Sequence, residues 1–177
     1  MGLTLADTYY LRAKTAGHYC DWEEACETLN YALSYDEKHC ASLCLLGEIY
    51  AKHFSMYPAA FECFDKVIAL DNTYLEVYPL YAKYLIWADK IGRAQKLIHY
   101  AFTIKGISKA ELYWLVAYSL EVKKNYKIAL KMLHKARLET YNEDYMYFLE
   151  EQKNRMKKKI KLNDKLKYSK KIKKDKK

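Results

Sequence analysis

The chain has 177 residues, of which about half are hydrophobic, and it carries a formal net charge of +9. This length fits one domain plus a tail, and the hydrophobic content is enough to bury a sizeable core. Five glycines and two prolines are too few for the turns that a β-rich fold needs, so the composition favours long helices over strands and hairpins.

The positive charge is concentrated at the C-terminal end. Residues 153–177 hold 14 of the 31 basic side chains and only 2 of the 22 acidic ones, which leaves 17 basic and 20 acidic side chains before them. The preceding part is therefore mildly acidic and the tail is a polycation. The isoelectric point near 9.1 describes the tail and is weak evidence that the rest of the chain binds nucleic acid.

Two further features bear on location. The first residues lack the basic and hydrophobic regions of a secretory signal, and no hydrophobic run approaches the ~18 residues that a membrane-spanning helix needs. Five cysteines without such a signal favour free thiols in a reducing compartment. We therefore expect a cytoplasmic protein.

Hydrophobic periodicity predicts helices along most of the chain. Asp21, Asp71 and Ser108 have side chains suited to caps or turns, and Pro58 stands near a predicted helix start. An amphipathic segment near the end predicts a further helix that caps the preceding ones. The predicted helices span residues 6–19, 22–35, 40–53, 57–70, 74–88, 91–104, 109–123, 126–139 and 142–161.

Small residues recur at a fixed period. Ala25, Ala60, Ala94 and Ala129 lie 35, 34 and 35 residues apart, and each is followed by apolar or small side chains four and seven positions later. This spacing places all three side chains on one stripe of a helix. A period near 34 is typical of an array of helix–turn–helix repeats.

A second set of small residues lies upstream of these alanines, on the preceding helix of each pair: Ala13, Gly47, Ala82 and Ala117. Two helices can approach closely only where their side chains are small. A small residue on each helix is therefore what a tightly packed antiparallel pair requires.

This pattern resembles the tetratricopeptide repeat (TPR) over roughly residues 6–143. The first repeat fits without a gap, the second has one extra residue near its internal turn, and the third departs most, with Ile91 at the aromatic turn position and Pro79 inside its first helix. The resemblance implies an all-α fold, a right-handed α-solenoid. We expect residues 1–160 to form the repeat domain with its capping helix, and residues 161–177 to form a lysine-rich tail that is a helical extension or disordered.

The resemblance also implies where a partner would bind. In TPR proteins the first helix of each pair lines a concave groove, and we expect Tyr10, Trp87, Trp114 and Tyr118 to anchor a ligand there because aromatic side chains dominate binding hot spots. Packing between repeats is the competing interpretation for each of them, whereas Trp22 sits at a core position and is expected to be structural. The predicted partner-binding residues are Tyr10, Lys14, His18, Cys44, Glu48, Lys52, Lys83, Trp87, Trp114 and Tyr118.

We therefore predict a non-enzymatic scaffold or adaptor that binds a peptide or helix of a partner protein in the groove. No zinc-ligand spacing, glycine-rich phosphate loop or nucleophile signature occurs, so no metal, cofactor or small-molecule substrate is expected. Some TPR proteins clamp the C-terminal carboxylate of chaperone tails, but the required asparagine is absent here and Glu76 would repel a carboxylate.

The alternative function is a nucleic-acid-associated repeat protein that uses its basic tail. Helical repeats of this length can read RNA one base per repeat, but such a groove must be basic. Four glutamates stand against three lysines at the groove positions, which is no phosphate track: Glu48, Glu76, Glu111 and Glu121 against Lys14, Lys52 and Lys83. The tail itself is predicted to be a solvated end, a contact for an anionic surface or a partner contact. Hydrophobic residues interrupt its lysines, so a basic amphipathic helix is one form of it: Leu162, Leu166, Tyr168 and Ile172.

Overall fold

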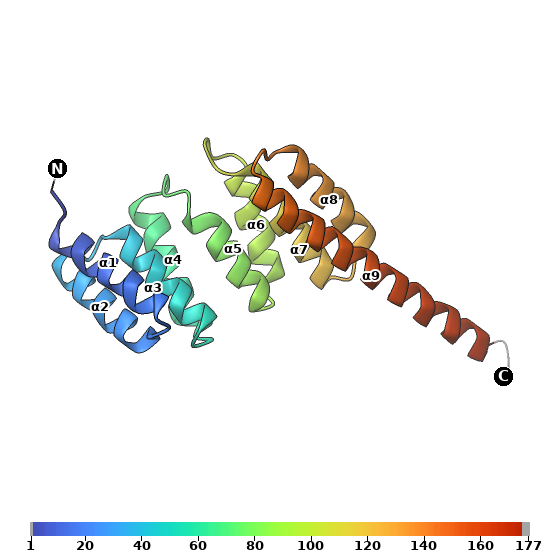
Figure 1. The fold of residues 1–177 in the computed structure, drawn as a ribbon, viewed down its shortest axis with the longest axis horizontal. Helices are drawn as coiled ribbons and strands as arrows, with labels where there is room; N and C mark the ends of the chain where they lie inside the picture. Colours follow the sequence, from blue (N-terminus) through green and yellow to red (C-terminus); the bar gives the residue numbers. More distant parts are fainter. Residues whose placement is uncertain (1, 175–177) are drawn as a thin grey trace. The chain divides into compact units, whose positions relative to one another are not determined.

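The computed structural model describes the backbone of residues 2–174 and the side chains of residues 2–165, and this part of the chain is helical with no strand. Tyr168 and its neighbours Leu166 and Ile172 therefore lie outside the described side chains. The helices are α1 (Leu5–His18), α2 (Trp22–Tyr35), α3 (Cys40–Lys52), α4 (Tyr57–Leu70), α5 (Val77–Trp87), α6 (Ile91–Ala101), α7 (Lys109–Val122), α8 (Tyr126–Leu138) and α9 (Glu143–Lys174) (Figure 1).

Side-chain caps explain several of the helix starts. The Asp21 side chain accepts a hydrogen bond from the Glu24 amide at the start of α2. The Ser108 side chain accepts one from the Glu111 amide at the start of α7. Thr4 forms a capping box with Asp7 that begins α1. These side chains satisfy amide groups that the first turn of a helix leaves without a partner.

Helix α5 begins three residues later than the periodicity predicts. The Asp71 side chain accepts hydrogen bonds from the Thr73 amide and hydroxyl, and the Asp71 carbonyl accepts one from the Tyr74 amide. The Val77 amide then donates to the Tyr74 carbonyl. Residues 71–76 therefore form consecutive turns, because local side-chain hydrogen bonds compete with helix formation there.

The turn inside each predicted helix pair contains one residue in the left-handed region. These residues are Cys20, Ser55, Asp89 and Lys124, with φ between 55° and 62°. Each of them stands five positions before one of the recurring alanines, so the backbone of the turn repeats with the same period as the sequence. In three turns an amide donates to the carbonyl five residues earlier, whereas in the second the Met56 amide donates to the Tyr50 carbonyl, six residues earlier. This longer span accommodates the extra residue of the second repeat.

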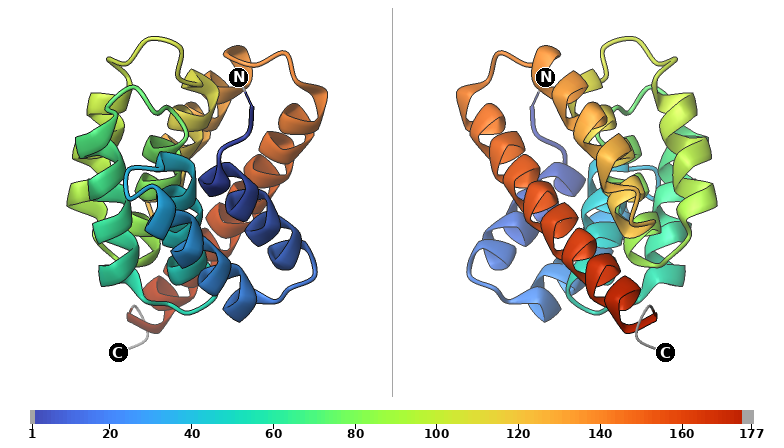
Figure 2. Two further views of the ribbon diagram at one scale, coloured as in Figure 1. Left: turned by 90° about the vertical axis from the view of Figure 1, so that its left-hand side faces the viewer. Right: turned by 90° about the vertical axis from the view of Figure 1, so that its right-hand side faces the viewer.

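The chain divides into two compact units, residues 1–90 and residues 91–177. In the first unit α1 packs on α2 and α3 packs on α4, each as an antiparallel pair (Figures 1 and 2). Its core joins the two pairs through Ala13, Ala25, Leu29, Leu46 and Ile49. Trp22 packs against this core, as expected for a structural residue.

Gly47 shows why the pattern requires a small residue on the first helix of a pair. A Cβ atom at this position would lie 2.8 Å from Phe64 Cε1 and 3.1 Å from Cys63 Cβ. Helices α3 and α4 therefore approach too closely for any larger side chain. The recurring Ala25, Ala60, Ala94 and Ala129 are likewise fully buried.

In the second unit α7 and α8 form an antiparallel pair, and α9 packs on α8 (Figure 1). The core comprises Ala117, Ala129, Leu133 and Ala136 from the pair, together with two buried residues of α9, Leu149 and Met156. The N-terminal part of α9 thus covers the apolar side of the last pair, and the helix continues to Lys174. The boundary between the two units falls next to Ile91, in the repeat that departs most from the TPR pattern.

Candidate functional site

In the first unit, the predicted binding residues lie on three helices: α1, α3 and α5. We call this set the first-helix face: Tyr10, Lys14 and His18 on α1, Cys44, Glu48 and Lys52 on α3, and Lys83 and Trp87 on α5. Lys14, His18 and Lys52 are exposed, and Tyr10, Glu48 and Lys83 are half-buried. The face therefore offers both charged groups and aromatic rings to a ligand.

Cys44 is the member of the first-helix face that a ligand reaches least, because only 5% of its surface is exposed. Burial, and then the nearby carboxylates of Glu76 and Glu48, raise the pKa of its thiol to about 12. The thiol therefore stays protonated near neutral pH. It behaves as a small buried apolar group rather than as a nucleophile or a metal ligand.

An aromatic cluster on α5 forms the most exposed apolar part of the face. The Tyr84 and Trp87 rings meet edge-on with centroids 5.2 Å apart, and Lys83 Nζ lies 4.6 Å from the Tyr84 ring and 5.7 Å from the Trp87 ring. The Tyr84 hydroxyl donates to Glu48 Oε1 of α3 at 3.2 Å. Burial and the Glu48 carboxylate both raise the pKa of Tyr84, so this hydroxyl remains a donor. Trp87 is thus held in place by its neighbours while 44% of its surface stays exposed.

The opposite edge of the face contains a second polar network. Tyr10 meets His39 edge-on at 5.8 Å, and His39 Nε2 lies 3.2 Å from Asp7 Oδ1. Hydrogen bonds from the Thr4 amide and hydroxyl, and then His39, hold the pKa of Asp7 below its ordinary value. Lys14 Nζ lies 5.6 Å from the Tyr10 ring. These contacts order the rim beside Tyr10.

In the second unit the equivalent residues are less accessible to a ligand, because side chains of α9 pack against them. Trp114 of α7 packs edge-on against Phe148 of α9 with centroids 5.4 Å apart, and the Tyr118 ring stacks on Trp114 at 5.9 Å. Tyr118 and Trp114 are both half-buried. Packing against α9 therefore accounts for at least one side of the Trp114 ring.

Glu121, another groove position of α7, is 95% buried beneath two cations of α9. Arg155 donates to both carboxylate oxygens, at 3.1 and 2.6 Å, and the Lys159 ammonium also binds Oε1. A bidentate arginine contact is among the strongest charge-assisted hydrogen bonds in proteins. This carboxylate therefore holds α9 on α7 and is not available to a ligand.

The periodicity of small residues did not reveal these polar contacts, although the sequence carries a signal for them. Glu48 and Tyr84 are 36 residues apart, and Glu121 and Arg155 are 34 apart. Both separations are close to one repeat length, because equivalent helices of successive repeats lie side by side. A search for complementary polar residues one period apart finds both pairs.

The described residues contain neither a metal-binding cluster nor a membrane-spanning helix. No three histidine, cysteine or acidic side chains lie where they could hold a metal ion together. No helix in the same part of the chain combines the length and the hydrophobicity that crossing a membrane requires.

Comparisons with known proteins identify the fold. The structure is similar to that of a thermophilic TPR protein from Thermus thermophilus, with a TM-score of 0.69 and 12% identity over 88% of this chain and 81% of that one. MamA from Desulfovibrio magneticus matches with a TM-score of 0.66 and 16% identity over 94% of this chain and 97% of the other. PilW, a widely conserved type IV pilus biogenesis factor, matches with a TM-score of 0.68 and 14% identity over 76% of this chain.

The chain spans 62% of the length of PilW. No protein-family model and no curated protein sequence matches it. At these low identities the likeness concerns the fold, and the fold is that of the TPR proteins: an all-α solenoid of helix–turn–helix repeats.

Proposed function

We propose that this protein is a non-enzymatic interaction scaffold and that the first-helix face of residues 1–90 binds a peptide or a helix of a partner protein. The observation that carries the proposal is the exposed Trp87, which packs against Tyr84 and Lys83. The Tyr84 hydroxyl in turn donates to the half-buried Glu48. A rigid, exposed indole can desolvate a large area with little loss of conformational entropy, which is the property of a hot-spot residue.

The polar groups around this indole favour an extended peptide or a helix as the ligand. Lys14 and Lys52 are exposed on the same face and can meet acidic side chains or backbone carbonyls of a partner. Glu48 and the Tyr10 hydroxyl supply acceptors beside them. A small apolar substrate would leave these polar groups without partners, which costs binding energy.

Trp114 and Tyr118 remain predicted contacts in the second unit. They lie beside α9, so a ligand there would share their rings with Phe148. We therefore place the main anchor at Trp87 rather than at Trp114.

Affinity recovery from a lysate of the source cells tests the proposal. The tagged full-length chain, its Trp87→Ala variant and its Tyr141→Ala variant are compared by quantitative mass spectrometry. Tyr141 is an aromatic residue with 95% of its surface exposed and lies outside the face, so its replacement is the matched control. We expect the Trp87 variant to lose at least one protein that the wild type and the control both retain. If all three recover the same proteins in the same amounts, the face is not the binding site.

A further inference from the structure

The second unit carries a strong positive charge that is not confined to its end. Residues 91–177 hold 24 basic and 9 acidic side chains, whereas residues 1–90 hold 7 basic and 13 acidic ones. Residues 91–152 alone hold 10 basic and 7 acidic side chains, so the excess begins before the lysine-rich tail. A basic surface on this unit therefore has to be sought on α8 as well as on α9.

Helix α8 and the turn before it present one stripe of lysines. Lys124, Lys127, Lys131 and Lys135 follow each other at intervals of three or four residues, and all four are exposed. This spacing places Lys127, Lys131 and Lys135 on one side of the helix, opposite the side that buries Ala129, Leu133 and Ala136, and Lys124 lies in the turn before it. Successive lysines within α8 are about 6 Å apart along the helix axis.

The carboxylates of the same unit leave most of this stripe unpaired. Glu150 binds Arg137 and Lys153, and Glu121 binds Arg155 and Lys159. Within the described residues, Lys124, Lys127 and Lys131 have no carboxylate partner. These three cations are therefore available to an anionic ligand.

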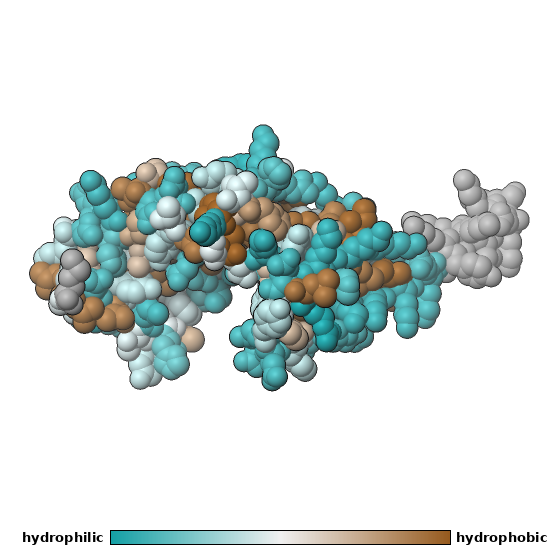
Figure 3. Space-filling model, turned by 90° about the horizontal axis from the view of Figure 1, so that it is seen from above, coloured by the Kyte–Doolittle hydropathy of each residue, from teal (hydrophilic) through white to brown (hydrophobic). Residues whose placement is uncertain are grey.

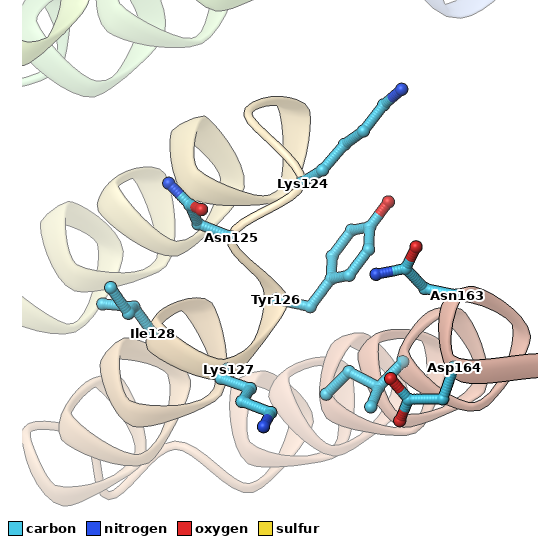
Figure 4. Close-up of a pocket in the computed structure, with 8 residues that line it drawn as sticks. Lys124, Asn125, Tyr126, Lys127, Ile128, Asn163 and Asp164 are labelled. Carbon is cyan, nitrogen blue, oxygen red and sulfur yellow. The ribbon is translucent and has the colours of Figure 1, made fainter. Parts of the chain in front are cut away.

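A cavity of about 360 Å³ opens beside the start of the stripe, between the α7–α8 turn and α9 (Figure 4). Lys124, Tyr126 and Lys127 line one side of it, and Asn163 of α9 points toward the Tyr126 ring (Figure 4). Ile128 and Ile160 supply apolar walls, and Asn125 and Asp164 complete the lining. The cavity thus combines an aromatic ring, an amide and apolar contacts beside two lysines.

A second cavity, of about 460 Å³, shares Lys124 and Tyr126 with the first. Arg155 and Lys159, the two cations that bind Glu121, also line it. Tyr126, which is half-buried and packs partly against the core of the second unit, therefore lines both cavities. A view from above the orientation of Figure 1 shows a different face of the molecule, on which hydrophobic patches lie among hydrophilic residues (Figure 3).

We infer that the α8–α9 surface binds single-stranded nucleic acid, with the phosphates on the lysine stripe and a base in the cavity against Tyr126. Lysines act as point charges along a phosphate backbone and do not impose the bidentate geometry of arginine, which suits a contact that is independent of sequence. Aromatic rings beside a basic track are the usual stacking platforms for single strands. An acidic polypeptide could use the lysines, but it does not pair each negative charge with a stacking ring as a nucleotide does, and a duplex keeps its bases stacked inside.

This site is separate from the first-helix face of residues 1–90, where glutamates stand beside the lysines. The inference therefore does not depend on the peptide-binding proposal, and either of the two can fail alone.

Fluorescence anisotropy with the full chain and a labelled twelve-nucleotide oligouridine tests the inference. We expect Lys127→Glu/Lys131→Glu to weaken binding at least tenfold and to flatten the salt dependence, lowering its slope by about 1.4 for the two lost phosphate contacts. Lys38→Glu/Lys66→Glu makes the same charge change at exposed residues of the first unit, outside the first-helix face, and should alter binding by less than twofold. Tyr126→Leu should weaken binding at least fivefold, whereas Tyr126→Phe keeps the ring and should not.

Three results would overturn the inference. The first is equal weakening by the stripe variant and its control, which would mean that net charge alone drives binding. The second is a chain truncated after Lys165 that loses all binding while the stripe variant retains it, because the tail alone would then be the site. The third is competition by polyglutamate or by a DNA duplex that matches the oligouridine, which would assign the surface to acidic proteins or to duplexes. Thermal melts of each variant separate these results from loss of folding.

Discussion

In the first compact unit the predicted binding positions line an exposed face, whereas in the second unit side chains of α9 lie on the equivalent positions. Trp87 is held but exposed, while Trp114 packs on Phe148 and Glu121 is buried under Arg155. The two units also differ in net charge, since residues 1–90 are acidic on balance and residues 91–177 are strongly basic. One repeat pattern therefore supports two different surfaces, and the helix that follows a pair decides which side chains stay accessible.

The comparison can be tested first through the glycines, one from each unit. Gly47→Val should destabilise the chain by about 3 kcal/mol, because the new side chain would overlap Phe64 and Cys63. Gly92 of α6 has no neighbouring side chain within 4 Å of a Cβ, so Gly92→Ala should stabilise by about 0.5 kcal/mol. Urea unfolding of both variants measures the two effects. Equal effects of the two substitutions would show that close helix packing is not what requires Gly47.

The attachment of α9 gives the next largest effect. Glu121→Gln should destabilise the second unit by about 1–2 kcal/mol, because the buried carboxylate loses charge-assisted hydrogen bonds while its half-exposed partners regain water. Hydrogen exchange should become faster in α9. Glu150→Gln removes a more exposed ion pair and should change stability by less than about 0.5 kcal/mol. A smaller effect of Glu121→Gln than of this control would contradict the role of Glu121.

Glycine substitutions in the turns inside the helix pairs should stabilise both units to a similar extent. Ser55 and Lys124 have φ values of 55° and 61°, and a left-handed conformation costs a residue with a Cβ about 1 kcal/mol. Ser55→Gly and Lys124→Gly should therefore each stabilise the chain by up to about 1 kcal/mol in thermal or urea unfolding. The corresponding alanine variants keep the Cβ and should show no gain. A gain with alanine would instead point to an unfavourable contact of the original side chain.

The smallest effect concerns pH and the first unit. His53 stacks on Trp22 with centroids 3.6 Å apart, and burial, with Lys52 nearby, holds the pKa of His53 below the ordinary value of 6.5. The unfolded chain thus takes up this proton first, so the stabilising contribution is present above pH 6.5 and declines as the pH falls through this value. NMR titration should give a pKa below 6.5 that moves toward 6.5 in Trp22→Leu. An unchanged pKa in that variant would exclude stacking as the source of the burial.

The sequence was sufficient to predict the helix pairs and their tight packing, because these depend on local periodicity and on small residues such as Gly47 and Ala129. Helix ends were less predictable: the side-chain hydrogen bonds of Asp71 delay α5, although they involve only neighbouring residues. The sequence predicted which positions lie on the first helix of each pair, but it did not predict which of their side chains are exposed. Whether Cys44 or Trp114 can meet a ligand depends on which helix packs over it, and that follows from contacts between residues about one repeat apart.

Photocrosslinking from positions 87 and 114 tests the central claim most directly. p-Benzoylphenylalanine is placed at one position at a time in the full-length chain, which is then irradiated in a lysate of the source cells. The account predicts that the probe replacing Trp87 forms a covalent adduct with another polypeptide, while the probe replacing Trp114 links to α9 of its own chain. Adducts with a partner from position 114 and none from position 87 would contradict it.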